Sequence, residues 1–164
     1  MPAAAEFAEP GGGGVCDARS RIKKIFMERT LAIVKPDAFG RKLTGDILKR
    51  IEASGLQLCA LKVKHLTRAE AQMFYEVHKE RPFYGSLCDY MTSGPVVIAV
   101  LGGDNAITRW RELMGATDPA KAAAGTIRKD FGLDVEKNAT HGSDAPETAA
   151  REIAFFFSAL ELVG

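Results

Sequence analysis

One histidine near the end of the chain lies in a polar setting that suits chemistry. His141 stands in the stretch Asn138–Asp144, just before an amphipathic pattern. A histidine with an ordinary pKa of about 6.5 is mostly neutral at pH 7, so a ring nitrogen can attack an electrophile or move a proton. A turn histidine that only hydrogen-bonds to nearby backbone fits the same heptapeptide equally well. Residues elsewhere in the chain are needed to distinguish a reactive histidine from a structural one.

Three basic residues stand at places where a hydrophobic core does not need them. Lys35 follows the apolar run Thr30–Val34, and Pro36 after it keeps Lys35 extended at a strand end. Lysine at a strand end is commonly only a solubilising group. Arg111 lies on the flank of a predicted helix and Arg128 in an irregular segment. Arginine binds phosphate oxygens in pairs and lysine adds a compact charge, so the three could hold a polyphosphate beside a histidine.

Three more side chains could complete such a site. Phe83 follows the helix break at Pro82 and offers an aromatic face to a nucleobase, and Thr117 lies in the irregular segment. Glu152 lies beside the apolar stripe of the last helix, where a carboxylate is costly unless it is paired, although a solvated glutamate is the commoner outcome. Phosphoryl transfer needs little beyond in-line positioning and charge stabilisation.

Three apolar runs predict strands, and a fourth strand is weakly marked. Val96–Leu101 is uninterrupted, which is typical of a strand buried on both faces. The second run changes its apolar phase between Ala60 and Leu61, which indicates a bulge or burial on two sides. The strands are expected over Thr30–Val34, Leu56–Leu66 and Val96–Leu101, and between Leu133 and Thr140, with Leu133–Val135 as a short candidate.

Four patterns of period 3.6 predict amphipathic helices. The second begins at the capping box Thr67–Glu70, and the last at the pair Asp144 and Glu147. Thr44 and Asp104 can cap the other two. The expected inward residues are Ile47, Leu48 and Ile51; Met73, Phe74 and Val77; Ile107, Trp110 and Met114; and Ile153, Phe156, Phe157 and Leu160.

Helices that alternate with a few strands predict an α/β (α+β) sandwich. The small topology that fits best is a ferredoxin-like βαββαβ core, with an antiparallel four-stranded sheet covered by helices. Between Gly115 and Asn138 both periods are weak. A long irregular segment inside a compact domain is more often functional than accidental.

Composition limits the class of protein. The 164 residues are 46% hydrophobic and 26% charged, with a net charge of +1, so no overall field recruits nucleic acid or a membrane surface. Cys16, Cys59 and Cys88 are widely spaced, as in a reducing compartment, and no apolar run is long enough to span a membrane, so we expect a cytoplasmic protein. Residues 1–26 are predicted to be a flexible N-terminal extension, with 27–164 as a single domain and Met27 a candidate start.

From about Met27 to Val163 the sequence resembles nucleoside diphosphate kinases nearly end to end. The motif Asn-x-x-His-Gly-Ser-Asp, which ends at Asp144, is highly specific to that family. The resemblance implies a ferredoxin-like core and a ping-pong exchange, in which a nucleoside triphosphate such as ATP phosphorylates His141 and a nucleoside diphosphate then accepts the γ-phosphate. The motifs that carry the resemblance are Thr30–Asp37, Arg81–Phe83, Ser93–Val97, Gly125–Arg128 and Asn138–Asp144.

The resemblance also implies a role for individual side chains in catalysis. Glu152 would bond one nitrogen of His141 so that the other faces the phosphorus, and Ser143 would be the companion polar group. Tyr75 would support the site near Lys35. The residues implied in nucleotide binding are Lys35, Arg111, Thr117 and Arg128 at the phosphates, Lys35 and Asn138 at the sugar, and Phe83, Leu87 and Val135 at the base.

Family members use Mg²⁺ held mainly by the nucleotide's phosphates, so no protein metal site is expected. The implied partners are nucleoside tri- and diphosphates, ATP and GTP among them, and further copies of the chain in a tetramer or hexamer. Several residues depart from the family pattern, none of them at a position implied to touch the nucleotide. They are Tyr84, Gly102, Asp118, Ala124 and Ala145.

A non-catalytic protein that binds nucleotides or nucleic acid is the alternative from another class. The basic residues between 19 and 24 would serve it. The intact set of His141, Lys35, Arg128 and Glu152 favours the enzyme, so nucleic acid is not an expected partner. His65 and His78 share no motif with His141 and are interpreted as structural or solvent-facing, which argues against a zinc site.

Overall fold

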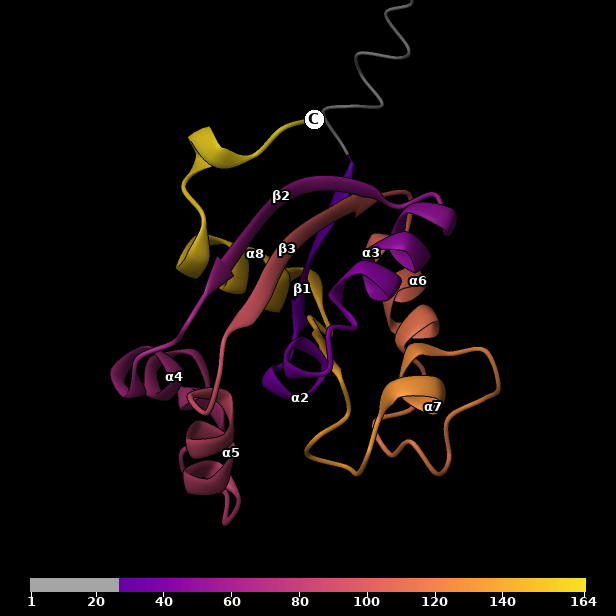
Figure 1. The fold of residues 1–164 in the computed structure, drawn as a ribbon. Coiled ribbons are helices and arrows are strands. Elements are labelled where there is room, and N and C mark those ends of the chain that lie inside the picture. Colours follow the sequence, from indigo (N-terminus) through magenta and orange to yellow (C-terminus); the bar gives the residue numbers. More distant parts are fainter. Residues whose placement is uncertain (1–26) are drawn as a thin grey trace, which may run out of the picture.

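The computed structural model describes residues 27–164; the predicted extension over residues 1–26, with the basic residues of the nucleic-acid alternative, lies outside that part of the chain. The strands of the described part are β1 (Glu28–Val34), β2 (Gln57–Lys64), β3 (Val96–Gly103) and β4 (Thr140–Gly142). They form one antiparallel sheet in the order β2-β3-β1-β4 (Figure 1). β1 and β3 are therefore central, and β2 and β4 are the edges.

Helices cover both faces of this sheet. The longer ones are α3 (Thr44–Ala53), α4 (Arg68–Phe74), α5 (Tyr84–Met91), α6 (Ala106–Met114) and α8 (Pro146–Phe156), and the short ones are α2 (Pro36–Gly40), η1 (Glu76–His78), α7 (Ile127–Phe131) and η2 (Ala159–Glu161). β1, α3, β2, β3, α6 and β4 follow one another as in the βαββαβ unit, with α4 and α5 inserted between β2 and β3. The predicted fold class is confirmed.

The two faces of β1 belong to two separate clusters of buried side chains. Ala32 and Val34 pack with residues of α3 and α6, on the right of the sheet in Figure 1. Leu31 and Ile33 pack with residues of α4, α5 and α8 on the opposite face. Successive side chains of a strand point to opposite faces, so a strand covered on both sides needs a continuous apolar run. This accounts for the sequence of β1 and also of β3.

The strand predictions held best where a strand is central. β3 is buried along nearly its whole length, as expected. The irregularity in β2 is real, but it falls between Leu58 and Ala60 instead of between Ala60 and Leu61. The short candidate Leu133–Val135 was wrong: the amide of Leu133 bonds to the carbonyl of Lys137 across a local turn. The fourth strand is β4, which begins at the last residue of the expected range, Thr140, and continues beyond it to Gly142.

The helix predictions were right about the buried faces of α3 and α6 and wrong about several ends. The Thr67 capping box is present, but Met73 of α4 is exposed, and so is Val77, since α4 ends before it at Phe74. Leu160 is also exposed, because α8 ends at Phe156. The capping predictions at Thr44, Asp104 and Asp144 were wrong, since the residues at those caps are Leu43, Asn105 and Ala145.

Three α-helices were not predicted. α5 is eight residues long, and α2 and α7 have five residues each. α7 interrupts the segment that was expected to be irregular. Within residues 27–164 no helix combines the length and the apolar character that crossing a membrane would require.

Candidate active site

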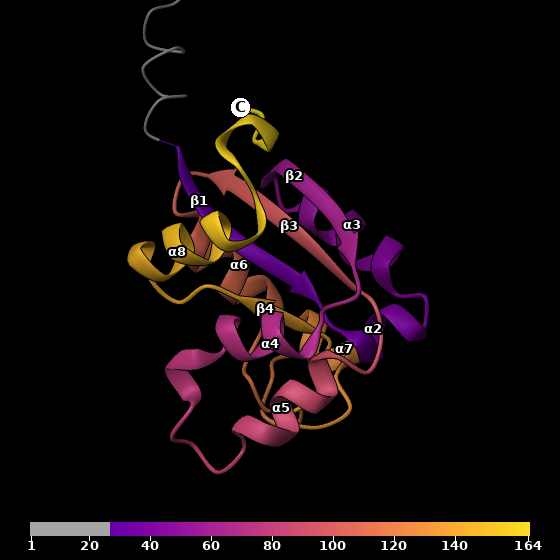
Figure 2. The same ribbon diagram turned by 90° about the vertical axis from the view of Figure 1, so that its left-hand side faces the viewer.

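His141 is in the middle of β4, in a strand and not in the turn that the heptapeptide suggested. Its partner in the register is Ile33 of β1. β4 lies between α8 and α4 (Figure 2), and the ring of His141 meets the rings of Phe74 and Tyr75 at centroid distances of 5.6 and 6.2 Å. Its side chain is 21% exposed. The histidine is thus held by packing and still open to solvent on one side.

A buried carboxylate holds one nitrogen of His141. Nε2 lies 3.2 Å from each carboxylate oxygen of Glu152, which α8 presents from its inner face. The hydroxyl of Ser143 donates to the same carboxylate at 2.7 Å and accepts from the amide of Leu31 at 3.2 Å. The predicted pairing of Glu152, Ser143 and His141 is present in the structure.

The pKa of Glu152 reflects two opposed effects. Burial raises it, and the hydrogen bonds and charge of His141, together with the Ser143 hydroxyl, lower it by more, so the pKa lies below its usual value. Glu152 is therefore ionised at neutral pH. An ionised partner favours the tautomer of His141 with the proton on Nε2, which leaves the lone pair on Nδ1.

Two cations are buried close to one another at the carboxyl end of β1. Lys35 donates to Asn138 Oδ1 at 2.7 Å and to the carbonyl of Glu136 at 3.1 Å. Burial and then the charge of Arg128 lower the pKa of Lys35 to about 8. Burial and then the charge of Arg111 lower the pKa of Arg128 to about 10. The predicted cations are therefore near enough to repel one another, and an anion between them would relieve that repulsion.

Arg128 also ties β4 to the loop before it. Its two terminal nitrogens donate to the carbonyls of Gly115 and Thr140, each at 3.0 Å. Its Nε is buried without a hydrogen-bond partner among the described residues. The start of α7, which the capping hydroxyl of Thr126 fixes, sets the position of this side chain.

Asn138 is the centre of the loop's hydrogen bonds. It is 2% exposed, and its Nδ2 donates to the carbonyls of Thr117 and Val135 at 3.0 and 2.9 Å. Its Oδ1 accepts from Lys35. The predicted residues Thr117 and Val135 are thus joined to Lys35 through one amide.

The predicted base-contacting residues lie at the open end of this arrangement. Phe83 and Val135 are 50% and 57% exposed, and Leu87 is partly buried against the core. The hydroxyl of Ser86 in α5 lies 3.5 Å from the carboxylate of Glu136, so α5 contacts the loop before β4. Arg111 and Thr117 are exposed. Arg111 lines a hollow of about 490 Å³ with Gly115 and Asp144.

Tyr75 contacts the ring of His141. Its ring also meets the rings of Phe74 and His78, and the ring 5.9 Å from the Lys35 ammonium is that of Tyr90. The Tyr75 hydroxyl is buried without a hydrogen-bond partner in the described chain. Burial, and then the charge of Glu152, raises its pKa, so the hydroxyl keeps its proton.

Sequence reasoning missed some neighbours of the site. Phe74 and Trp110 were expected only as core residues, and Tyr90 was not considered. Tyr90 donates to the carboxylate of Asp37, which also pairs with Arg41. Helical spacing identified Phe74 and Trp110 as inward-facing, but no sequence signal connects either of them with His141.

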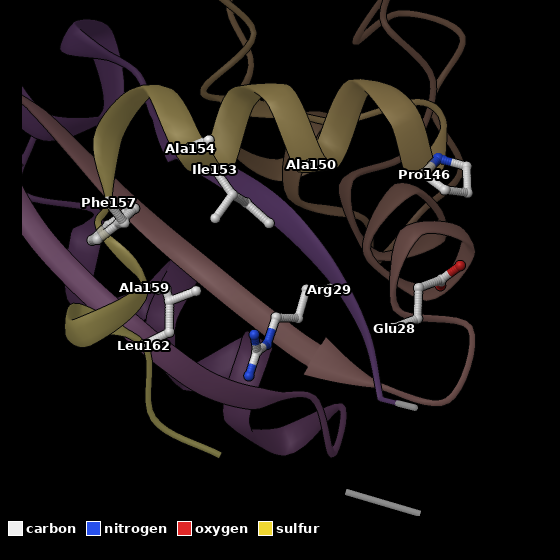
Figure 3. A pocket seen from close by; sticks show the side chains of 9 residues that line it. All are labelled: Glu28, Arg29, Pro146, Ala150, Ile153, Ala154, Phe157, Ala159 and Leu162. Carbon is white, nitrogen blue, oxygen red and sulfur yellow. The ribbon is translucent and has the colours of Figure 1, made fainter. Parts of the chain in front are cut away.

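A groove of about 450 Å³ on the other side of α8 holds none of the predicted site residues. Figure 3 shows Ile153 and Phe157 lining it above Arg29 of β1. Most of its lining side chains are apolar. It is separate from the cations and from His141.

The arrangement around His141 can bind a polyphosphate anion and present a histidine nitrogen to it, which defines a phosphate-handling site. Residues 28–162 match the family model "Nucleoside diphosphate kinase". The chain belongs to the nucleoside diphosphate kinase family.

Individual relatives agree with this assignment. The nucleoside diphosphate kinase of Desulfatibacillum aliphaticivorans is 60% identical over 138 residues, which are 84% of this chain and 100% of the relative. That of Cereibacter sphaeroides is 62% identical over 138 residues, 84% of this chain and 99% of the relative. The solved Aquifex aeolicus nucleoside diphosphate kinase has a TM-score of 0.82 and 51% identity, covering 84% of this chain and 99% of that one.

Loss of the Ser143 hydroxyl should weaken the fold at neutral pH and reduce the dependence of stability on acid pH. We expect Ser143→Ala to lower the free energy of unfolding by about 1–3 kcal/mol, because it leaves the Leu31 amide and the Glu152 carboxylate short of a buried partner. Urea denaturation at neutral pH measures this. Ser86→Ala, at an exposed serine, is the control and should change little.

The same variant should alter how stability depends on pH. A carboxylate whose folded pKa is depressed stabilises the protein above its unfolded pKa, and this stability is lost as the pH falls through the folded pKa. Without the Ser143 bond the pKa of Glu152 is depressed less, so the variant should lose less stability between neutral and acid pH. If the free energy of unfolding of the variant falls with acid pH as steeply as that of the unmodified protein, the pairing of Ser143 with Glu152 is contradicted.

Proposed function

We propose that this enzyme moves the γ-phosphate of a nucleoside triphosphate to a nucleoside diphosphate in two half-reactions, with His141 as the carrier. Family membership makes the chain a nucleotide kinase. The observation that carries the role of His141 is the bond of its Nε2 to the ionised Glu152. That bond leaves Nδ1 as the proposed nucleophile, and Arg128 donates to the carbonyl of the preceding residue, Thr140.

In the first half-reaction Nδ1 attacks the γ-phosphorus in line with the leaving oxygen. The N–P bond forms as the bond to the bridging oxygen breaks, and a nucleoside diphosphate departs. The imidazole ring becomes positively charged, and Glu152 stabilises that charge through Nε2–H. In the second half-reaction a terminal phosphate oxygen of another diphosphate attacks the same phosphorus and restores neutral His141.

The cations are proposed to hold the phosphates. Lys35 and Arg128 act at the buried end and Arg111 at the exposed end, since their mutual repulsion favours a bound polyanion. The unpartnered Nε of Arg128 and hydroxyl of Tyr75 are donors that a phosphoryl oxygen could satisfy. Supporting this proposal, neither donor has another partner within residues 27–164.

The sugar and base are proposed to bind at the outer end. Asn138 and Lys35 are placed for hydroxyl groups, and Thr117 assists at the phosphates. Phe83 offers a half-exposed ring, with Val135 and Leu87 adding apolar surface. Stacking alone reads no hydrogen-bond pattern on a base, so we expect ATP, GTP and other nucleotides to be accepted.

Mg²⁺ is the proposed cofactor, bound mainly by the nucleotide. Among the described residues no group of three or more His, Cys, Asp or Glu side chains could hold a metal ion, which fits a metal carried by phosphates. When bound, the ion would neutralise charge on the phosphate oxygens. We also place the enzyme in the cytoplasm, a reducing compartment that fits the buried thiols of Cys59 and Cys88.

The phosphate carrier can be tested directly. Incubation with γ-labelled ATP should give an acid-labile, alkali-stable phosphoprotein, and added diphosphate should discharge it. His141→Ala should abolish the label and lower the exchange rate by at least about 10⁴-fold, since the nucleophile is removed. His65→Ala is the control, because His65 contacts the carbonyl of Thr92 away from the site. Label retained by His141→Ala would refute the mechanism.

The depressed pKa of Lys35 predicts how ADP affinity changes with pH. Lys35 loses its charge above about pH 8, whereas ADP keeps a constant charge there, so Kd should rise by about tenfold between about pH 7 and pH 9. Between about pH 8 and pH 10.5, Lys35 binds more protons in the unfolded state than in the folded state. The free energy of unfolding should therefore rise with pH over that range. Titration calorimetry measures Kd.

Two variants isolate the contribution of Lys35. Lys35→Met should bind ADP more weakly and lose most of the pH dependence of the Kd. Lys137→Met, at an exposed lysine of the loop before β4, should keep that pH dependence. An affinity that does not change with pH in the unmodified protein would show that Lys35 is not the titrating group.

We further propose a homo-oligomer, a tetramer or a hexamer, that uses the edge strand β2. Leu61 and Val63 of β2 are 44% and 63% exposed, and they pair in register with buried residues of β3. Val63→Lys should shift the mass measured by light scattering toward smaller species. Val77→Lys replaces an equally exposed valine away from this edge and should not. A monomeric mass for the unmodified protein would refute the proposal.

A further inference from the structure

Trp110 of α6 contacts the backbone of His141. Its side chain is fully buried, and Nε1 donates to the carbonyl oxygen of His141 at 3.2 Å. Trp110 belongs to the cluster of buried residues under α3 and α6, on the face of the sheet opposite Glu152. One residue is therefore held from both faces: its side chain by Glu152 and its carbonyl by Trp110.

The register of β4 explains how the indole comes so close. His141 pairs with Ile33, whose side chain faces α4 and α8, and Gly142 pairs with Ala32, whose side chain faces α6. A Cβ at position 142 would lie 2.5 Å from both Cδ1 and Nε1 of Trp110. Only glycine leaves room for the indole against this backbone, so Gly142 and Trp110 form a matched pair.

β4 needs support of this kind because it is a three-residue edge strand. β1 pairs with it along one side only. The carbonyl of Thr140 accepts from Arg128, and the carbonyl of His141 accepts from Trp110. Displacements of about 1 Å at a reacting group can cost on the order of 10²-fold in rate. A strand this short has few ladder hydrogen bonds to prevent such a displacement.

We propose that Trp110 is a positioning residue for phosphoryl transfer: its indole N–H fixes the backbone of His141 and so fixes the ring nitrogen that attacks the phosphorus. This inference rests on the proposed role of His141 as phosphate carrier. The indole of Trp110 lies on the face of the sheet opposite Glu152, and Trp110 is not one of the residues proposed to hold the phosphates. Its effect should therefore appear in the rate of transfer and not in nucleotide affinity.

The experiment removes the N–H and keeps an aromatic ring. Trp110→Phe should form phosphohistidine from ATP about tenfold more slowly in single-turnover rapid quench, the effect of one lost hydrogen bond on the barrier, with the Kd for ADP unchanged. Ile51→Val trims a residue of the same buried cluster on α3 and should leave the rate unchanged. A variant rate equal to that of the unmodified protein, or a Kd that worsens as much as the rate, would overturn the proposal.

A second replacement covers the case in which Trp110→Phe does not fold. Trp110 is the single tryptophan of the chain, so 3-benzothienylalanine can be placed at position 110 alone, with sulfur in place of the ring N–H and nearly the same shape. It should reproduce the slower transfer. A transfer rate equal to that of the unmodified protein would overturn the proposal.

Amide hydrogen exchange separates this inference from the proposed function. Loss of the indole N–H should speed exchange of the amides of β4 by several-fold, whether or not His141 carries phosphate. If the unmodified protein forms no phosphohistidine, the proposed function is refuted. If the amides of β4 are protected equally in either Trp110 replacement, the positioning role of Trp110 is refuted.

Discussion

The site depends on two buried cations whose hydrogen-bond partners are neutral oxygens. Burying a charge is costly unless its donors are satisfied. Lys35 and Arg128 are 7% and 9% exposed, and they donate to an amide oxygen and to backbone carbonyls. Neutral partners satisfy most of these donors without cancelling the positive charge, and among the described residues the Nε of Arg128 has no partner. The lowered pKa values of both groups reflect this cost, which the proposed binding of a polyphosphate would offset.

This constraint accounts for the long segment between α6 and β4. Carbonyl oxygens inside helices and strands are already used by their ladders, so free ones must come from irregular backbone. Gly115 and Glu136, both in this segment, supply carbonyls to Arg128 and Lys35, and Asn138 closes it by bonding to the carbonyls of Thr117 and Val135. The irregular segment thus supplies most of the oxygens that bind the two buried cations, and the edge strand β4 supplies the carbonyl of Thr140.

The predictions that were confirmed concern features that depend on residues close together in the sequence. The apolar run of β3, the buried stripes of α3 and α6 and the Thr67 capping box depend on spacing within one element, and each was found. β4 was misplaced because three residues carry no period, and its strand character comes from pairing with β1. α2 and α7 were missed because five residues span little more than one helical turn, and α5 because no apolar period was recognised in its eight residues.

The same division holds for the site. Resemblance to a family named its residues, and spacing placed Lys35 at a strand end and Glu152 beside a buried stripe. The distances among them are tertiary. Whether Tyr75 meets the ring of His141, and whether Trp110 is only a core residue, depends on how α4 and α6 dock on the sheet. No period in the chain contains that information.

Burial differs between the two ends of the proposed site, and this difference would explain how one enzyme could serve many nucleotides. Lys35 and Arg128, at the proposed phosphate end, are almost fully buried, whereas Phe83 and Val135, at the proposed base end, are half-exposed. Charges act more strongly where water is excluded, so most binding energy should come from the phosphates, which all nucleotides share. An exposed ring adds stacking that every base can make. Breadth of substrate then follows from where the protein buries its contacts, without any group that must adapt to each base.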